Sequence, residues 1–344
     1  MPVMTVTGAK TVDELGIILP HEHLLIDLRN QFSEFADPEK RRVSRQPVGA
    51  DNLDVLRRNP YAIRDNLLLD DLELAIAEVG YFQRAGGTTI VDCTSIGIHR
   101  DPRKLRELSL RSGVNVIAGS GYYTHDTHPA EMERWSPAEI AARIIGDLID
   151  GIDGTPIKAG VIGEIGTSQP IHPHERKVLL AAAIAFQRTG APVYAHTFPW
   201  GDTGIEVTEL LLKHGVTPDK LVICHTDVEP NLDYIVTLLS QGVWIEFDNF
   251  GKTFEIDPAD RAFAGGNFVS DAERIQLLRR LVALGYAGQL LLTNDICLKM
   301  MLRAYGGDGY DHILRNIVPM LRGEGLPEEI IDLLIRGNPR RLFS

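Results

Sequence analysis

Short runs of apolar and β-branched residues alternate along this chain with longer segments whose apolar positions recur with the period of an α-helix. The short runs are four to six residues long, which is typical of buried strands. The expected strands are residues 16–19, 88–92, 115–119, 160–165, 192–196, 221–225, 243–247 and 290–293. The expected helices are residues 70–85, 101–112, 137–150, 175–189, 204–213, 271–284 and 310–322. This alternation predicts repeated βαβ units around a parallel sheet.

Eight strand–helix units without an obvious linker favour a TIM (β/α)8 barrel over a doubly wound sheet. We therefore expect a single α/β domain over residues 1–344, because one barrel can hold about 250 residues or more. Three additions are expected: an N-terminal hairpin over 4–15 with a turn near Gly8-Ala9-Lys10, a long loop over 29–66 after strand 1, and an extra C-terminal helix over 327–336. The long loop leaves the barrel on the catalytic face, so it is either a surface excursion or a lid.

Composition narrows the class of protein without changing this fold. There are 35 Lys and Arg against 47 Asp and Glu, and the formal charge of −12 argues against nucleic-acid binding, which needs clustered basic residues. The sequence contains no apolar run of about 18 residues, the length that a membrane span needs, and no signal peptide is evident. Cys93, Cys224 and Cys297 lie far apart and predict neither disulfides nor a thiolate metal site. We expect a cytoplasmic protein that acts on a small molecule.

Histidines and carboxylates stand at the ends of five expected strands. His21 and His23 follow the first apolar run, and their i, i+2 spacing places both imidazoles on one side of an extended chain. Single polar residues close four further runs; they are Glu164, His196, His225 and Asp295. The carboxyl ends of barrel strands form the catalytic face, so these six side chains are expected to converge there. Separate structural roles for all six would require six independent coincidences.

Four histidines and two carboxylates form a ligand set that suits two divalent ions of borderline softness. Zinc is the first expectation, and Mn²⁺ and Co²⁺ are the alternatives. Glu164 would bridge the two ions, which would lie roughly 3.5–4 Å apart and share a hydroxide. That hydroxide is the expected nucleophile, so the ligand set predicts hydrolysis. The three cysteines are not needed in this set and are interpreted as core residues.

These motifs resemble the phosphotriesterase family of the amidohydrolase superfamily along the whole chain. The matching segments are His21-Glu-His23-Leu-Leu-Ile-Asp27, Gly163-Glu-Ile-Gly-Thr-Ser168, Ala195-His196, Cys224-His225, Asn294-Asp295 and Gly337-Asn-Pro-Arg-Arg-Leu-Phe343. The resemblance implies that His21, His23 and Asp295 bind the more buried ion. It also implies that His196 and His225 bind the more exposed one.

The proposed bridge departs from the well-known members of this family, which use a carboxylated lysine after strand 4. Lys158 lies six residues before Glu164, roughly 20 Å of extended chain away, and cannot take that place. Glu164 would supply the bridge instead. In this respect the chain resembles the phosphotriesterase homology proteins and related sequences.

Four further residues are candidates for contact with a substrate. Tyr122 and Tyr123 follow strand 3, and lactonases that this chain resembles place a phenol near the metals, where it can polarise a carbonyl. Either tyrosine could instead pack on the barrel rim. Lys252 and Lys299 follow strands 7 and 8, and two cations beside one pocket of an acidic protein suggest an anionic substrate group. Ordinary surface lysines are the alternative.

The combined prediction is a binuclear hydrolase of carboxylic esters, first of all a lactonase for small polar or anionic sugar-like lactones. Asp295 is expected to carry the proton to the departing alkoxide, and Asp27, Asp92 and Asp227 could fix the imidazole tautomers. Phosphotriester hydrolysis is the nearest alternative, because it uses the same metals and nucleophile. A mononuclear deaminase would have no use for the bridge, and a non-catalytic ligand-binding barrel would have no need of all six ligands. The resemblance also favours a homodimer.

Overall fold

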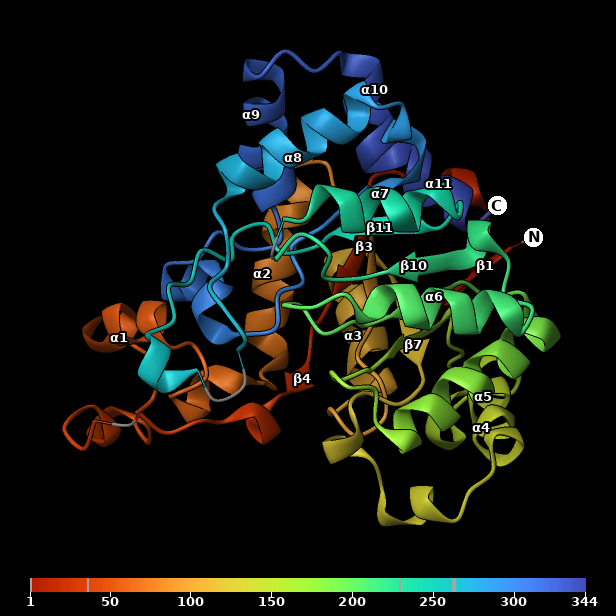
Figure 1. Ribbon diagram of the computed structural model, residues 1–344, viewed down its shortest axis with the longest axis horizontal. Helices are drawn as coiled ribbons and strands as arrows, with labels where there is room; N and C mark the ends of the chain where they lie inside the picture. Colours follow the sequence, from red (N-terminus) through yellow and green to blue (C-terminus); the bar gives the residue numbers. More distant parts are fainter. Residues whose placement is uncertain (1, 36, 229, 262–263) are drawn as a thin grey trace.

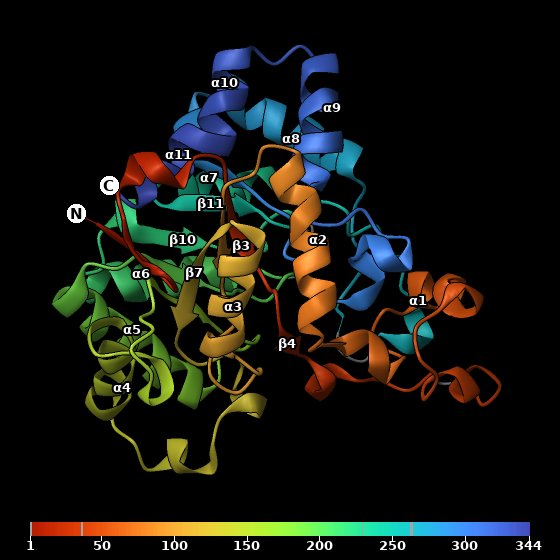
Figure 2. The same cartoon turned by 180° about the vertical axis from the view of Figure 1, so that it is seen from behind.

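The computed structural model describes residues 2–35, 37–228, 230–261 and 264–344. Across these residues, eight strands form one parallel sheet in the order β12-β11-β10-β9-β8-β7-β6-β3. Their bounds are β3 Ile18–Glu22, β6 Thr89–Asp92, β7 Asn115–Ser120, β8 Val161–Ile165, β9 Val193–Ala195, β10 Leu221–Ile223, β11 Trp244–Phe247 and β12 Leu290–Leu292. The sheet curves into a barrel inside a layer of helices (Figure 1, Figure 2), which confirms the predicted TIM-barrel fold.

Side-chain hydrogen bonds join the first and last strands of this sheet. The Thr293 hydroxyl, one residue beyond β12, donates to the His21 carbonyl over 2.7 Å. The fully buried Glu22 carboxylate accepts from the backbone and side-chain N–H groups of Asn294 and from the Ile296 backbone, and it shares the Thr293 hydroxyl proton with the His21 carbonyl. These bonds satisfy a carboxylate that would otherwise be costly to bury. Glu22 therefore closes the barrel, on the side of the strand away from His21.

The helices that follow the strands cover the outside of the barrel. They are α2 Leu72–Arg84, α3 Pro102–Ser112, α4 Pro137–Ile149, α5 Pro173–Thr189, α6 Thr203–Lys213, α7 Leu232–Ser240 and α8 Asp271–Ala283. Side-chain caps fix several of their first residues, as the Ser136 hydroxyl does by accepting from the backbone at the start of α4. The predicted set lacks α7, which has only nine residues. The expected helix over 310–322 is a π-helix, Ile313–Ile317, followed by α9 Val318–Gly323.

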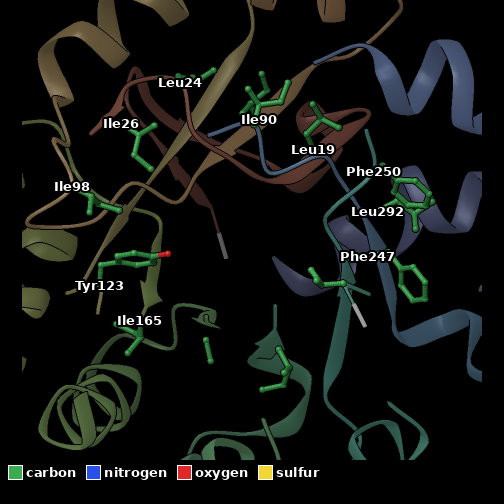
Figure 3. Close-up of a cluster of buried hydrophobic side chains, with 14 of the residues drawn as sticks. Leu19, Leu24, Ile26, Ile90, Ile98, Tyr123, Ile165, Phe247, Phe250 and Leu292 are labelled. Atoms are coloured by element: carbon green, nitrogen blue, oxygen red, sulfur yellow. The ribbon is translucent and has the colours of Figure 1, made fainter. Parts of the chain in front are cut away.

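Two sets of buried apolar side chains fill the barrel interior and the layer under the helices. Alternation along β11 shows the division, because Trp244 belongs to the interior set while Ile245 and Phe247 belong to the outer set. Figure 3 shows part of the outer set, including Phe247 and Phe250. Glu246 lies between two outward residues and so points into the interior.

The two ends of the chain lie near each other at one end of the barrel (Figure 1, Figure 2). The expected hairpin is present as β1 Val3–Thr5 and β2 Gly8–Lys10, but its turn is at residues 6–7. The predicted turn near Gly8-Ala9-Lys10 is therefore wrong, because these three residues form the second strand. The C-terminal segment comprises α10 Glu328–Asp332, a π-helix at Leu333–Gly337 and α11 Asn338–Leu342. None of the helices in the described residues combines the length and apolarity needed to span a membrane.

The long loop after the first barrel strand is a folded excursion. Its base is the antiparallel pair β4 Ile26–Asp27 and β5 Leu68–Leu69, and it contains the short helix α1 Leu53–Arg58. Backbone hydrogen bonds tie it to a second loop, the one between β11 and α8. The Glu255 N–H of that loop donates to the Arg57 carbonyl over 3.2 Å. Figure 1 shows α1 beside the barrel rather than over its helical layer. The excursion is thus a packed wall on one side of the barrel.

Candidate metal centre

The strand ends bring together all six side chains that the sequence pattern singles out. Two of them, His21 and Glu164, lie within strands β3 and β8. The other four follow the ends of β3, β9, β10 and β12 within three residues; they are His23, His196, His225 and Asp295. All six residues are buried, with at most 6% of their surface exposed. The apolar strands thus hold six ligand-type side chains at one end of the barrel.

Glu164 stands between two pairs of histidines. Its Oε1 lies 3.3 Å from His23 Nε2, and its Oε2 lies 3.6 Å from His21 Nε2. On the other side, Oε2 lies 3.2 Å from His196 Nδ1 and 3.4 Å from His225 Nε2. Burial raises the pKa of Glu164, but the charge of His21 and hydrogen bonds from the histidines outweigh burial and hold that pKa well below its usual value. A charged carboxylate shared by two imidazole pairs is the arrangement a bridging ligand needs.

Asp295 faces the first pair of histidines and is itself paired with a lysine. Its Oδ1 lies 3.2 Å from His23 Nε2 and 3.8 Å from His21 Nε2. Its Oδ2 accepts a hydrogen bond from the buried Lys252 ammonium. Burial raises the pKa of Asp295, but Lys252 lowers it more strongly, and the net pKa lies below the usual value. One oxygen of this carboxylate is therefore directed at the histidines and the other at a cation.

The backbone is strained at two of the six residues. His225 has a φ of 64° and Asp295 a φ of 48°, in the left-handed region that residues with a Cβ seldom adopt. Asp248 supports the first of them, because both of its carboxylate oxygens accept from the His225 backbone N–H, at 3.0 and 3.2 Å. Strain of this kind persists where the surrounding contacts impose it, and it is frequent at functional sites.

A further set of buried groups orients three of the histidine rings. Each of these rings directs its Nδ1 at an oxygen of a neighbouring strand end, which leaves Nε2 toward the other ligands. The contacts join His21 to Glu246 Oε2 over 2.9 Å, His23 to Thr94 Oγ1 over 2.9 Å, and His225 to Asp248 Oδ2 over 3.1 Å.

The aspartates expected in this role lie elsewhere, so that expectation is wrong. Short aspartate side chains readily bind backbone N–H groups and local cations, and these three do so here. Asp27 pairs with Arg29, Asp92 accepts from the backbone of Leu24 and Thr94, and Asp227 pairs with Arg274.

The donor atoms fit a pair of divalent ions. His21 Nε2 is buried and has no hydrogen-bond partner among the described residues, although it faces Glu164 and Asp295. His196 Nδ1 and His225 Nε2 lie only 2.7 Å apart, so at most one of these nitrogens can carry a proton between them. Three groups of ligand atoms are close enough to hold an ion. Two of them share Glu164, namely His21, His23 and Glu164, and Glu164, His196 and His225; the third is His21, Cys224, Glu246 and Asp248. Nitrogen and carboxylate donors of this kind suit zinc and similar ions.

A cavity of about 470 Å³ that is open to solvent adjoins the ligands. All of the six candidate ligands except His21 border it. Its apolar wall consists of Ile26, Leu28, Pro199 and Phe268, and its other polar or polarisable lining residues are Gln31, Tyr61, Tyr123, Asn249, Lys252 and Cys297. Gln31 and Tyr61 belong to the excursion after the first barrel strand. A substrate in this cavity would touch both the ligands and the excursion.

The structure separates the two candidate tyrosines. Tyr123 lines the cavity, and its ring centroid lies 4.7 Å from that of His196. Figure 3 shows the Tyr123 ring among buried side chains that include Ile165. Tyr122 does not line the cavity, and its ring packs 6.4 Å from that of Trp135. Only Tyr123 is therefore placed to touch a substrate.

The two candidate lysines are also separated. Lys252 lines the cavity, but its ammonium is paired with Asp295. Lys299 lies outside the cavity lining and pairs with Asp65 over 2.5 Å. The expectation that two cations flank one pocket is therefore wrong for Lys299, which does not line the cavity. Both ammonium groups are neutralised by carboxylates that the sequence pattern did not connect to them.

Several residues of the site escaped sequence reasoning. Glu246 and Asp248 carried a usable signal, because each is an acidic residue at an inward position of an otherwise apolar strand and its end. Gln31, Tyr61 and Phe268 carried none, since they lie in segments without periodic pattern. Their place at the cavity depends on how the loops pack.

Comparison with known proteins places the chain in a family. The sequence matches the model of the phosphotriesterase family over residues 1–343, which confirms the resemblance. A phosphotriesterase-related protein of Nematostella vectensis is 36% identical over 340 residues, covering 98% of this chain and 96% of the relative. An N-acetyltaurine hydrolase of Danio rerio is 36% identical over 349 residues, covering 99% of this chain and 97% of the relative.

A solved structure also matches this chain over its full length. The crystal structure of a resiniferatoxin-binding protein from Rhodobacter sphaeroides matches with a TM-score of 0.96 and 38% identity, covering 100% of this chain and 95% of that one. The fold, the candidate metal-ligand groups and the relatives therefore lead to one conclusion. This chain belongs to the phosphotriesterase family and is a metal-dependent hydrolase.

Proposed function

We propose that this protein hydrolyses a small carboxylic acid derivative with a basic leaving group, and that a lactone or alkyl ester is the first candidate. The observation that carries the proposal is the position of Glu164, whose two oxygens lie within 3.6 Å of nitrogens from four histidines. Two divalent ions at this place, zinc first and Mn²⁺ or Co²⁺ as alternatives, would supply an activated water and a Lewis acid.

The side chains of the cavity have distinct parts in this reaction. Asp295 accepts the proton of the attacking water and delivers it to the leaving oxygen, and Lys252 holds its second oxygen in place. The Gln31 amide donates to the Tyr123 hydroxyl over 3.4 Å, which leaves the phenolic proton free to bind the carbonyl oxygen of a substrate. The apolar wall around Phe268 excludes water from the acyl portion.

The leaving group separates this proposal from phosphotriester hydrolysis, which uses the same ligands. An alkoxide of high pKa departs only when it is protonated, whereas an aryl oxide can leave as an anion. A buried carboxylate beside the cavity supports the first kind of substrate. The lysine that lines the cavity is already paired with Asp295, which gives an anionic lactone no advantage over a neutral polar one.

Hydrolysis of a small acyl amide is a second candidate, and one observation favours it. A relative that is 36% identical over almost the full length of both chains is named an N-acetyltaurine hydrolase. An amine is a still more basic leaving group than an alkoxide, and it needs the same delivery of a proton. The proposed parts for Asp295 and Tyr123 apply to both substrates.

The test is a substrate panel run on metal-free protein that is then loaded separately with Zn²⁺, Mn²⁺ or Co²⁺. The panel contains γ- and δ-lactones, alkyl esters, N-acetyltaurine and an aryl dialkyl phosphate. We expect activity to disappear with chelation and to return with metal, with the highest kcat/KM on a lactone or alkyl ester. The highest kcat/KM on N-acetyltaurine would establish the second candidate.

A matched pair of histidine variants separates the site from the rest of the surface. His196→Ala should lose about one equivalent of metal together with activity, whereas His214→Ala changes an exposed histidine and should lose neither. Activity that survives chelation, or a clear preference for the phosphate, would reject the proposal. The homodimer suggested by the family resemblance stays a prediction that sedimentation of the loaded protein would check.

A further inference from the structure

An acidic residue lies inside the barrel where apolar side chains are the rule. Glu246 is on β11, has no exposed surface, and shares the interior with residues such as Val222 and Leu291. A carboxylate is retained in such surroundings only where a specific contact compensates its desolvation.

The hydrogen bond that Glu246 makes to a ring nitrogen is with His21, and the Cys224 thiol lies near the same carboxylate. Glu246 Oε2 lies 2.9 Å from His21 Nδ1, while Oε1 has no hydrogen-bond partner among the described residues. Asp248 does not replace it, because its nearest oxygen is 3.8 Å from the same nitrogen and is engaged with His225 instead. Glu246 is therefore the hydrogen-bonding acceptor of this ring nitrogen.

The contact decides which nitrogen of His21 can bind a metal. A histidine that binds a metal ion is a neutral imidazole with one proton, and a charged carboxylate can only accept, so Glu246 would hold that proton on Nδ1 when His21 binds an ion. The lone pair then remains on Nε2, which has no hydrogen-bond partner among the described residues and faces Glu164 and Asp295. The equivalent partner of His23 is the Thr94 hydroxyl, which can donate or accept and so does not select a tautomer in this way.

We propose that Glu246 is a positioning residue that fixes His21 in the tautomer and orientation needed to bind the more buried of the two ions. The proposal rests on the metal centre of the proposed function, and it adds that the more buried metal site depends on a carboxylate inside the barrel. Substituting a residue that hydrogen-bonds a metal ligand typically lowers metal affinity by roughly 10–100-fold.

The test compares Glu246→Gln and Glu246→Leu with the parent, all loaded with zinc. The first readout is the zinc affinity of the more buried site, measured by competition with a chelator. The second is the ¹H–¹⁵N signal of the His21 Nδ1–H, assigned by its absence in His21→Ala. A role limited to filling space would leave this signal unchanged.

We expect affinity to fall in the order Glu, Gln, Leu, by roughly 10-fold for Gln and up to roughly 100-fold for Leu. The Nδ1–H signal should move upfield in the Gln variant, because an amide oxygen is a weaker acceptor, and should exchange rapidly in the Leu variant. Tyr194→Phe is the matched control. Its hydroxyl is buried without a hydrogen-bond partner in the described residues, its ring lies 6.2 Å from that of His21, and its removal should change neither readout.

Each result decides the proposal. Parent-like affinity and an unshifted signal in the folded Gln variant would overturn it, even if the Leu variant does not fold. A parent protein that binds no zinc would overturn both this inference and the proposed function. A parent that binds two ions, with an unaffected Gln variant, would overturn only the role of Glu246.

Discussion

The six candidate metal ligands and the loops that line their cavity are held by different kinds of contact. The six ligands come from strand ends, are at most 6% exposed, and contact further buried polar groups such as Glu246 and Asp248. The excursion and the second loop are joined by Arg58, which pairs with Glu255 and Asp257 through side chains that are 25–75% exposed. The barrel thus holds the candidate metal ligands in place through buried contacts. The loops that would contact a substrate are joined to each other by weaker, exposed contacts.

The largest loss of activity is expected for a substitution among the buried candidate ligands, at Glu164. Glu164→Gln removes the charge shared by the two histidine pairs, so bound metal should fall from about two equivalents toward one. Turnover should fall by at least about 10⁴-fold on every substrate. Metal analysis alongside kcat checks this, and bicarbonate should not be needed for assembly. Two tightly bound ions with near-normal turnover would remove Glu164 from the bridge.

Asp295→Asn should produce the next largest loss, and the loss should depend on the leaving group. Asparagine keeps the shape and a carbonyl oxygen but cannot carry a proton at neutral pH. We expect a fall in kcat/KM of roughly 10²–10⁴-fold on lactones, alkyl esters and amides, and a much smaller fall on activated aryl esters. Metal content should stay near the parent value. A uniform loss with missing metal would mean that Asp295 is only a ligand.

The contrast between the two halves also explains what the sequence could predict. Strands were predictable because their inward residues are apolar and their ends are polar. The same pattern identified His21, Glu164 and Asp295 as candidate ligands. The first strand was placed too early because its last residue is Glu22, a buried acid that closes the barrel through partners more than 270 positions away. A local pattern contains no information about such a partner.

The lysines show the same limit within the site. Lys252 is 43 residues from Asp295, and Lys299 is 234 residues from Asp65, so only the packed structure reveals that both are paired. The loop wall was the least predictable part, since Gln31 and Tyr61 occupy a segment with neither strand nor helix period. Their position follows from the contacts between two loops and not from local preference.

Lys252→Met tests whether the lysine in the cavity positions the buried Asp295 or binds an anionic group of the substrate. Its partner is Asp295, so we expect kcat to fall by roughly 10–100-fold while KM changes little, for neutral and anionic substrates alike. Lys299→Met is the matched control, because that lysine lies outside the cavity, and it should leave both constants near the parent values. A rise in KM confined to anionic substrates would restore the role in anion binding.

Adjacent tyrosines offer a closer comparison. Tyr123→Phe removes the hydroxyl that lines the cavity, and we expect kcat on lactones to fall by roughly 10-fold, which is the scale of one neutral hydrogen bond to the reacting carbonyl. Tyr122→Phe removes a buried hydroxyl outside the cavity and should leave kcat unchanged. Equal effects of the two substitutions on kcat would show that the loss arises from packing of the rim.

The smallest effect is expected in the loop wall, at the ion pairs that join its two parts. Arg58→Ala removes the pairs with Glu255 and Asp257, but exposed pairs are screened by water and contribute little. The backbone bonds from the N–H groups of Glu255 and Asp257 to the carbonyls of Arg57 and Arg58 remain, so the two loops should stay joined.

We therefore expect KM and kcat of Arg58→Ala to stay within about twofold of the parent, the range that corresponds to a surface contact of this kind. Arg57→Ala, at the neighbouring exposed position of α1, is the matched control. The comparison between the two halves fails if Arg58→Ala alone raises KM by tenfold or more, and if high salt raises the KM of the parent in the same way. In that case the loop wall is held by its charges, and binding of the substrate depends on the ion pairs as strongly as on the strand ends.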